Sequence, residues 1–300
     1  MKVIRASVAG FCMGVRRAVT MAEAELAAAA SPPAGKASGR SFRPRVYSLG
    51  PLIHNPATLR RLCEAGLEIL DEEDGGGDLS GAAVIIRAHG ISPSAEDALV
   101  RRGARICDAT CPRVKASQMK ARSLAASGRA LFLAGQERHA EIAGIRGYVP
   151  SCIVAGNAAE AEDAAGKLYR ACPSASPALM GQTTMTPEEY TAIGEAIRKF
   201  FPGLEIIDTI CGAVRERQDA LRSLCSEVDA VIVAGGGDSA NTRGLLAAAL
   251  SLGKPAWLVE RAEDLPPGIF AYDSVGIASG ASTPDGALDE IEQALTRGPV

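Results

Sequence analysis

Short apolar runs and longer alanine-rich segments alternate along this chain. The apolar runs include residues 82–87, 130–134 and 230–234, which consist almost entirely of alanine, valine, isoleucine and leucine. Segments rich in alanine, arginine, glutamate or lysine follow them and predict helices. Alternating strands and helices are typical of parallel sheets with helical crossovers. The pattern therefore predicts an α/β fold of small, mainly parallel sheets with flanking helices.

A cysteine motif occurs three times and divides the chain into comparable parts. The motif reads Cys-x-x-Val-basic and begins at Cys12, Cys111 and Cys211. Its copies are about a hundred residues apart, which is the size of a small domain rather than of a solenoid repeat. We therefore expect three related modules, the third completed by the N-terminal strand. The expected boundaries are 14–110 for the first module, 111–207 for the second, and 208–300 with 1–13 for the third.

Each motif cysteine lies between an apolar segment and an expected helix. The sulfur would then sit at a helix N-terminus, where unsatisfied N–H groups and the positive end of the dipole lower a thiol's pKa and favour anionic ligands. Pro112 directly follows Cys111, and proline suits the first helical turn. Three activated thiolates would converge on one point if the modules pack around a common axis. The alternative is three unrelated core cysteines, because free cysteine is often buried and inert.

Composition and charge exclude several classes of protein. The 300 residues are 47% hydrophobic, enough for substantial cores, and only 4% aromatic, which favours compact α/β units over an all-β sandwich. A net charge of −3 gives no global bias toward nucleic acid or membranes. No apolar run reaches bilayer length, and the start, Met1-Lys2-Val3-Ile4-Arg5, does not read as a signal peptide. We expect a soluble, cytoplasmic protein.

Five further cysteines lack the motif. None of the eight cysteines forms a Cys-x-x-Cys pair, so the common zinc-ribbon and thioredoxin signatures are absent. Cys63 and Cys225 fall in helix-like patterns, where we expect them to fill the core. Cys107 lies in the strand that leads to Cys111. In an intracellular chain, this many cysteines indicates metal or redox chemistry before disulfides.

Polar residues gather where the expected strands end. The three histidines of the chain, His54, His89 and His139, all occupy such positions. A lone histidine is more often structural than catalytic, but three at strand ends favour function. Ligands bind at the carboxyl ends of strands in open α/β sheets.

Hydroxyl, amide and carboxylate groups occupy similar positions later in the chain. Ser239, Asn241 and Ser282, together with the histidines, offer donors that grip a phosphate, backed by glycine-rich turns and helix N-termini. Glu141 is the one carboxylate positioned to donate a proton, and the hydroxyl of Thr183 would relay one.

Three cysteines without a fourth protein ligand would suit an iron–sulfur cluster that leaves one iron open as a Lewis acid. A zinc site with three cysteines would need a histidine or water as its fourth ligand. An open cluster beside a diphosphate pocket would imply reductive chemistry on a small phosphorylated molecule.

An ordered set of motifs resembles one known family over nearly the whole chain, the 4-hydroxy-3-methylbut-2-enyl diphosphate reductases. Each motif alone is weak, but their order is highly specific. The motifs are Ala9-Gly10-Phe11-Cys12-Met13-Gly14-Val15, Ala88-His89-Gly90, Asp108-Ala109-Thr110-Cys111-Pro112, His139-Ala140-Glu141, Gly181-Gln182-Thr183-Thr184, and Cys211 with Arg217-Gln218.

The resemblance implies a trefoil of three α/β modules around a central 4Fe-4S cluster, and the last step of the non-mevalonate isoprenoid pathway. It implies that Cys12, Cys111 and Cys211 hold the cluster. Two electrons would arrive singly from a ferredoxin or flavodoxin type donor, the substrate hydroxyl would leave as water, and isopentenyl and dimethylallyl diphosphate would form. We expect a monomer or weak dimer. By resemblance, the diphosphate binds to His54, His89, Ser239, Asn241 and Ser282, and the substrate hydroxyl and protons are handled by His139, Glu141 and Thr183.

The sequence departs from the family pattern at four positions. Ala240 stands where a second serine is usual, which removes a hydrogen bond worth on the order of 1 kcal/mol. Ala140 replaces a usual proline, Val214 a common threonine, and Gly212 a larger residue. Two alternatives therefore stay open: a non-catalytic iron–sulfur or zinc redox sensor, and a reductase of another phosphorylated allylic alcohol.

Overall fold

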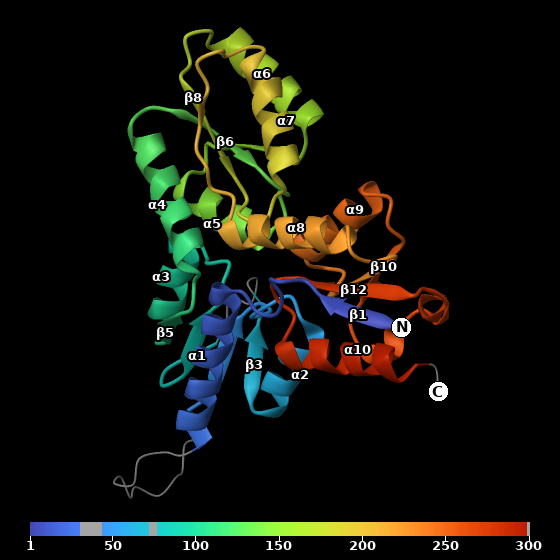
Figure 1. Cartoon of the computed structure of the whole chain (residues 1–300). Coiled ribbons are helices and arrows are strands. Elements are labelled where there is room, and N and C mark those ends of the chain that lie inside the picture. The colour runs from blue at the N-terminus through green and yellow to red at the C-terminus, as the bar shows by residue number, and fades with distance from the viewer. Residues whose placement is uncertain (31–43, 72–76, 299–300) are drawn as a thin grey trace, which may run out of the picture. The chain divides into compact units, whose positions relative to one another are not determined.

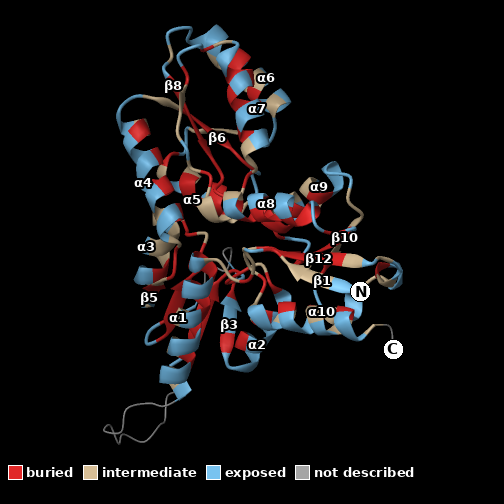
Figure 2. Cartoon of the chain, viewed as in Figure 1, coloured by how far each residue is buried: buried red, intermediate tan, exposed pale blue. Residues whose placement is uncertain are grey.

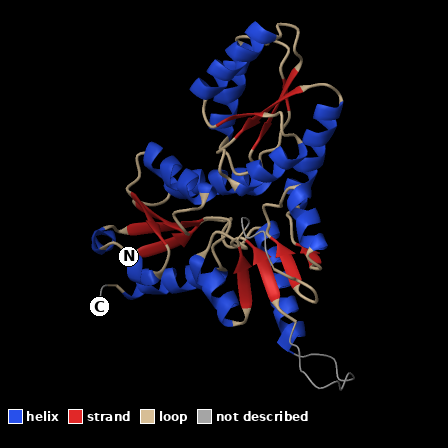
Figure 3. Cartoon of the chain, turned by 180° about the vertical axis from the view of Figure 1, so that it is seen from behind, coloured by secondary structure: helices blue, strands red, loops and turns tan. Residues whose placement is uncertain are grey.

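The computed structural model describes residues 1–30, 44–71 and 77–298 (Figure 1). These residues form three four-stranded sheets, and every strand pair in them is parallel. Helices flank each sheet (Figure 3). The predicted fold class, with three small parallel α/β sheets, is confirmed.

Contacts along the chain group it into two compact units. Unit 1 consists of Met1–Cys12, Thr183–Ala192 and Asp208–Val300, and unit 2 consists of Met13–Gln182 and Ile193–Ile207. The boundaries of the three predicted modules stay a prediction.

Unit 2 contains two of the sheets. One has the order β3-β2-β4-β5 and the other β7-β6-β8-β9. The strands are β2 (Val46–Leu49), β3 (Leu67–Leu70), β4 (Ala83–Ile86), β5 (Arg105–Asp108), β6 (Ala130–Ala134), β7 (Ile153–Ala155), β8 (Pro177–Gly181) and β9 (Glu205–Ile206). The helices are α1 (Met13–Ala30), α2 (Pro56–Glu64), α3 (Pro93–Arg101), α4 (Pro112–Ala126), α5 (Ala140–Tyr148) and α6 (Ala158–Ala171), and α7 (Pro187–Arg198) continues into unit 2 from unit 1.

Unit 1 contains the third sheet, in the order β1-β12-β10-β11. The N-terminal strand β1 pairs in parallel with β12, with Lys2 opposite Ser274 and Arg5 opposite Ile277. Its elements are β1 (Lys2–Arg5), α8 (Gly212–Cys225), β10 (Ala230–Ala234), α9 (Ala240–Ser251), β11 (Ala256–Val259), the 3₁₀ turns η1 (Ala262–Asp264) and η2 (Pro267–Ala271), β12 (Ser274–Ser279) and α10 (Asp285–Arg297).

All three sheets share one strand order. The strand that comes first along the chain after each module begins, β2, β6 or β10, lies between the second strand (β3, β7 or β11) and the third strand (β4, β8 or β12). The third strand also neighbours a fourth strand. β5 and β9 are the fourth strands in unit 2, whereas β1 takes this position in unit 1. The order reverses between the first and third strands, and ligands bind at such a switch point in open α/β sheets.

The central strands are buried on both faces, as helices on both sides of a parallel sheet require. β4, β8 and β10 are buried at every position, and their sequences are nearly continuous apolar runs (Figure 2). Separate apolar clusters cover the two faces of the unit 1 sheet, one around Leu221 and Val233 and the other around Ile232 and Ile291. These rigid sheets hold the loops at their carboxyl ends.

Two expectations about cysteines meet different outcomes. Cys225 is buried on α8, as predicted, but Cys63 is exposed, so the prediction that it fills the core is wrong. α2 buries Thr58 and Leu62, and Cys63 follows Leu62 by about 100° around the helix, which turns it to solvent. In the described residues, no helix is both long and apolar enough to cross a lipid bilayer.

Candidate functional site

Three loops of unit 2 carry the histidines. His54 follows β2 and precedes Asn55, whose side chain caps α2 by accepting from Thr58 N–H at 2.8 Å. His89 follows β4 in a tight turn closed by Gly90 N–H donating to Arg87 C=O at 3.0 Å. Gly90 has φ +71°, a conformation that glycine adopts at little cost. Local turn and cap geometry therefore fixes the backbone on either side of both rings.

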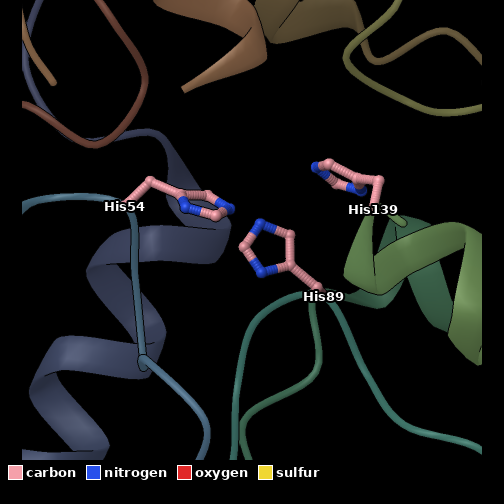
Figure 4. Close-up of side chains that lie close together, drawn as sticks. All are labelled: His54, His89 and His139. Atoms are coloured by element: carbon pink, nitrogen blue, oxygen red, sulfur yellow. The ribbon is translucent and has the colours of Figure 1, made fainter. Parts of the chain in front are cut away.

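The three histidine side chains come together at one point (Figure 4). The ring centroids of His54 and His89 are 4.7 Å apart, those of His89 and His139 5.3 Å, and those of His54 and His139 6.1 Å. One nitrogen of each ring lies within 4.8 Å of the others. Such a trio can bind an anion through its N–H groups or a metal ion through its lone pairs.

The surroundings of His89 keep it neutral. Burial, with the neighbouring His54, His139 and Arg87, holds the pKa of His89 well below its ordinary value. An anion between the rings would oppose this effect, because an opposite charge favours the imidazolium form. Binding of an anion by the trio would therefore favour protonation of His89.

His139 caps the helix that carries Glu141. Its Nδ1 accepts the backbone N–H of Glu141 at 3.2 Å, so in the neutral ring Nε2 carries the proton. Glu141 lies in the first turn of α5 and is completely buried. The short His139-Ala140-Glu141 segment therefore carries a ring N–H donor and a carboxyl group together.

Cys111 is tied to the His89 turn in unit 2. It occupies the N-cap of α4, and its backbone N–H donates to Ala88 C=O at 2.9 Å. A Cβ atom on Gly14 would lie 2.8 Å from the sulfur of Cys111, so only glycine allows this approach. Gly14 follows Cys12 by two residues.

Two candidate cysteines belong to unit 1. Cys12 N–H donates to Ala281 C=O at 3.0 Å, next to Ser282. Cys211 caps α8, and its N–H donates to the carbonyl of Thr183 at 2.8 Å. Cys111 and Cys211 have nearly the same backbone conformation, with φ/ψ of −57°/131° and −65°/129°. The predicted position of the cysteines, directly before a helix, is confirmed at all three.

A buried arginine in unit 1 interacts with both cysteines. Arg217 is 4% exposed and donates to Gly10 C=O at 2.6 Å and to Ala213 C=O at 3.1 Å. Burial lowers the pKa of Arg217, and electrostatic attraction to Cys12 and Cys211 opposes that effect. This guanidinium compensates negative charge where the two sulfurs lie.

The neutral phosphate-binding candidates lie on two neighbouring loops of unit 1. Ser239 caps α9, where its hydroxyl accepts Thr242 N–H at 3.3 Å. Thr283 donates its hydroxyl to Ala234 C=O at 2.8 Å, which ties the loop of Ser282 to the end of β10. Asn241 is 3% exposed, and neither its amide nitrogen nor its amide oxygen has a hydrogen-bond partner in the described part of the chain. A buried amide left in this state indicates a ligand that satisfies it.

The shared topology explains how these residues gather. The predicted polar residues all lie on or just beyond the loops that follow the first or third strand of a sheet, and each predicted cysteine follows a fourth strand. The structure brings His54, His89, His139, Glu141 and Cys111 into unit 2, and Cys12, Thr183, Cys211, Ser239, Asn241 and Ser282 into unit 1.

Comparison with known proteins decides the family. Residues 3–296 match the family model described as LytB protein. The chain belongs to the LytB family. A curated relative from Treponema pallidum (strain Nichols), named 4-hydroxy-3-methylbut-2-enyl diphosphate reductase, is 43% identical over 99% of this chain and 84% of its own.

Two solved LytB structures resemble the whole chain. The E-1-hydroxy-2-methyl-but-2-enyl-4-diphosphate reductase from Plasmodium falciparum has a TM-score of 0.87 at 26% identity, covering 99% of this chain and 89% of that one. A second structure, described as (E)-4-hydroxy-3-methyl-but-2-enyl diphosphate reductase, the terminal enzyme of the non-mevalonate pathway, has a TM-score of 0.70 at 34% identity over 99% and 100% of the two chains. The resemblance inferred from the motifs is confirmed.

The departures from the LytB pattern fall at helix starts. Ala140, Gly212 and Ala240 are the first residues of α5, α8 and α9. A proline at the first helical position would fix φ, so Ala140 leaves the start of α5 less constrained. Val214 is buried on α8, where an apolar side chain packs without needing a hydrogen-bond partner.

Arg217 and Gly14 belong to the motifs identified in the sequence, but the sequence alone predicted no role for either residue. Gln118 was missed entirely: it is 1% exposed on α4, and a Cβ atom on Gly90 would lie 2.6 Å from its amide nitrogen. A glutamine in an apolar helical stripe was the available signal.

Proposed function

We propose that this protein is a 4-hydroxy-3-methylbut-2-enyl diphosphate reductase that forms isopentenyl and dimethylallyl diphosphate. The observation that carries the proposal is the LytB match over residues 3–296. The reaction is the last step of the non-mevalonate isoprenoid pathway, the step for which a similar solved enzyme is named.

Cys12, Cys111 and Cys211 would hold one 4Fe-4S cluster. Their chemistry fits this group, because each sulfur precedes a helix N-terminus that favours an anionic complex. Gly14 leaves room at the sulfur of Cys111, and Arg217 offsets charge at the other two. When bound, such a cluster supplies single electrons and a Lewis-acidic iron. A zinc ion would supply no electrons, so a reductase activity favours the cluster.

The substrate's diphosphate would bind to His54, His89, Ser239, Asn241 and Ser282. The histidine trio offers up to three N–H donors within a few ångströms, and protonation of His89 would add charge when the anion arrives. Asn241 would donate its amide N–H, which explains why its buried amide has no partner in the described protein. The hydroxyls of Ser239 and Ser282 would donate the remaining hydrogen bonds.

Protons would reach the substrate from His139, Glu141 and Thr183. Replacing the allylic hydroxyl by hydrogen consumes two electrons and two protons and releases water. Glu141 is buried two residues after His139, whose Nδ1 accepts the Glu141 backbone N–H and whose Nε2 carries a proton, so the pair would orient the hydroxyl and protonate it. Thr183 would relay protons through its hydroxyl, and its carbonyl holds Cys211.

The electrons would come from a one-electron carrier of the ferredoxin or flavodoxin type. Two separate transfers complete one turnover, so the carrier binds twice. A redox sensor would need the cysteines but would not require the buried Glu141.

Anaerobic assays of reconstituted protein with the diphosphate substrate and a strong one-electron reductant test the proposal. We expect both five-carbon diphosphates by mass spectrometry. Protein that holds a 4Fe-4S cluster and gives neither product would contradict the proposal and favour the altered substrate or the sensor.

A further inference from the structure

The exposed face of α4 has an unusual charge, and the role inferred for it rests on the proposed function. α4 begins directly after Cys111 and carries no acidic residue; its four basic residues are Arg113, Lys115, Lys120 and Arg122. The other α-helices in the described ranges have net charges between −3 and +1. α4 therefore stands out in a chain whose net charge is −3.

Most of this charge faces solvent and is not neutralised. α4 buries Val114, Ser117, Gln118, Ala121 and Leu124, and its opposite side is exposed (Figure 2). Within residues 1–30, 44–71 and 77–298, Arg113, Lys120 and Arg122 form no ion pair, and only Lys115 lies near a carboxylate, 3.5 Å from Asp108. Met119 is 39% exposed on the same side.

The N-terminus of α1 extends this surface. Gly14 packs against Cys111, and Arg17 donates to the carbonyls of Thr110 at 3.2 Å and Asp108 at 3.1 Å. Met13 beside them is 60% exposed. We call this surface the basic face. It consists of Arg113, Met119, Lys120 and Arg122 of α4 and Met13 of α1.

We infer that the basic face is the docking surface for an acidic one-electron carrier protein. Basic side chains without internal partners attract a carrier of negative charge and raise its association rate, and exposed methionines supply an adaptable apolar contact. The face begins at Arg113, two residues after Cys111, and continues along α4, so a carrier docked at the start of the face lies beside a proposed ligand of the electron acceptor. Each encounter oxidises one carrier and delivers one electron, and two encounters with two protons convert the allylic C–O bond into C–H and water.

The test compares two reductants on one variant. Arg113→Glu with Lys120→Glu reverses the charge of the face at exposed positions. Glutamate is favourable in the first turn of α4, where Arg113 lies, and it is a good helix former at the exposed mid-helix position of Lys120, so folding is retained. With a reduced, acidic ferredoxin as donor at low ionic strength, we expect the KM for ferredoxin to rise about tenfold or more and its salt dependence to weaken. With dithionite-reduced methyl viologen, turnover should equal that of the parent.

A matched control reverses two exposed charges elsewhere, Arg60→Glu on α2 and Arg170→Glu on α6, and should leave both assays unchanged. An unchanged KM for ferredoxin in the α4 variant, or equal loss with methyl viologen, would overturn the docking surface. Binding of oxidised ferredoxin, measured by calorimetry, tests the face without turnover: equal affinity of parent and variant overturns it. The inference is also overturned if the α4 variant loses binding to anionic lipid vesicles while its KM for ferredoxin stays equal to that of the parent. Absence of turnover by the parent with methyl viologen would instead refute the proposed function.

Discussion

The carboxyl ends of the strands carry different chemistry in the two units. In unit 2 they carry titratable side chains, namely His54, His89, His139 and Glu141. In unit 1 the predicted phosphate ligands are neutral donors, Ser239, Asn241 and Ser282. The same strand order supports both sets, so the fold provides the positions and the side chains provide the roles. Changes in unit 2 should alter proton transfer and pH dependence, and changes in unit 1 should alter binding.

The cysteines of both units are the strongest test, because they should act as one set. Cys111→Ser should lose most of its iron and sulfide and all turnover. Cys107→Ser is the matched control in the same segment: burial and Glu25 raise the pKa of Cys107 to about 11, so this thiol is a poor metal ligand. Iron and sulfide analysis of both variants checks this. A full cluster in Cys111→Ser would refute the ligand set.

Removing Glu141, the proposed proton donor of unit 2, should have the next largest effect. Glu141→Gln keeps the shape of the buried side chain and should lower kcat by about 100-fold or more, with the cluster intact. Glu137→Gln changes an exposed carboxylate of the same loop, paired with Arg146 at 2.9 Å, and should leave kcat unchanged. Anaerobic kinetics with iron analysis separates the two, and equal kcat values would disprove the proton role.

Substitutions of the predicted phosphate ligands in unit 1 should change KM rather than kcat. Asn241→Ala removes one hydrogen bond to a charged group, worth about 1.5–3 kcal/mol, so KM should rise about 10- to 150-fold. Because the amide has no partner in the described protein without substrate, the variant should unfold at the same denaturant concentration or higher. Asn157→Ala is the control: it loses the cap of α6 and should be less stable by about 1 kcal/mol with an unchanged KM. A stability loss in Asn241→Ala without a KM change would reverse the assignment.

The histidine trio should make unit 2 sensitive to acid. The folded protein holds the pKa of His89 below that of the unfolded chain, so the unfolded chain binds more protons as the pH falls. The contribution of His89 to the free energy of unfolding is therefore complete above about pH 6.5. Below that pH it declines by at most about 1.4 kcal/mol per pH unit for one proton. Denaturant unfolding at several pH values should show a shallower decline for His89→Gln than for the parent. Identical pH profiles would exclude this role of His89.

The smallest expected effect concerns Ala240. Restoring the usual hydroxyl with Ala240→Ser should lower KM by about tenfold or less, because one hydrogen bond contributes about 1 kcal/mol. Steady-state kinetics beside the parent checks this, and an unchanged KM would mean that position 240 does not reach the diphosphate.

The sequence predicted what depends on local rules. The Cys-x-x-Val-basic motif identified three cysteines that each precede a helix, and apolar runs such as residues 230–234 identified the buried central strands. Strand β3 was missed, because Leu67-Glu68-Ile69-Leu70 is a short edge strand that buries only its two ends.

Long-range geometry was beyond local rules. Strand order places His54 and His89 after the adjacent strands β2 and β4, but His139 follows β6 of the other sheet of unit 2, so its approach depends on how the two sheets of that unit pack. The role of Arg217 depends on its burial against Gly10, a contact across 207 positions. Cys63 was misassigned because a helical pattern alone did not show which face of α2 packs inward.

The central claim is tested most directly by anaerobic steady-state kinetics with 4-hydroxy-3-methylbut-2-enyl diphosphate and reduced methyl viologen. The measurement compares the reconstituted parent with Glu141→Gln and Asn241→Ala. The account predicts isopentenyl and dimethylallyl diphosphate from the parent, loss of kcat in Glu141→Gln and a raised KM in Asn241→Ala. A parent that holds its cluster yet forms neither product, or the two variants changing the same constant, would contradict it.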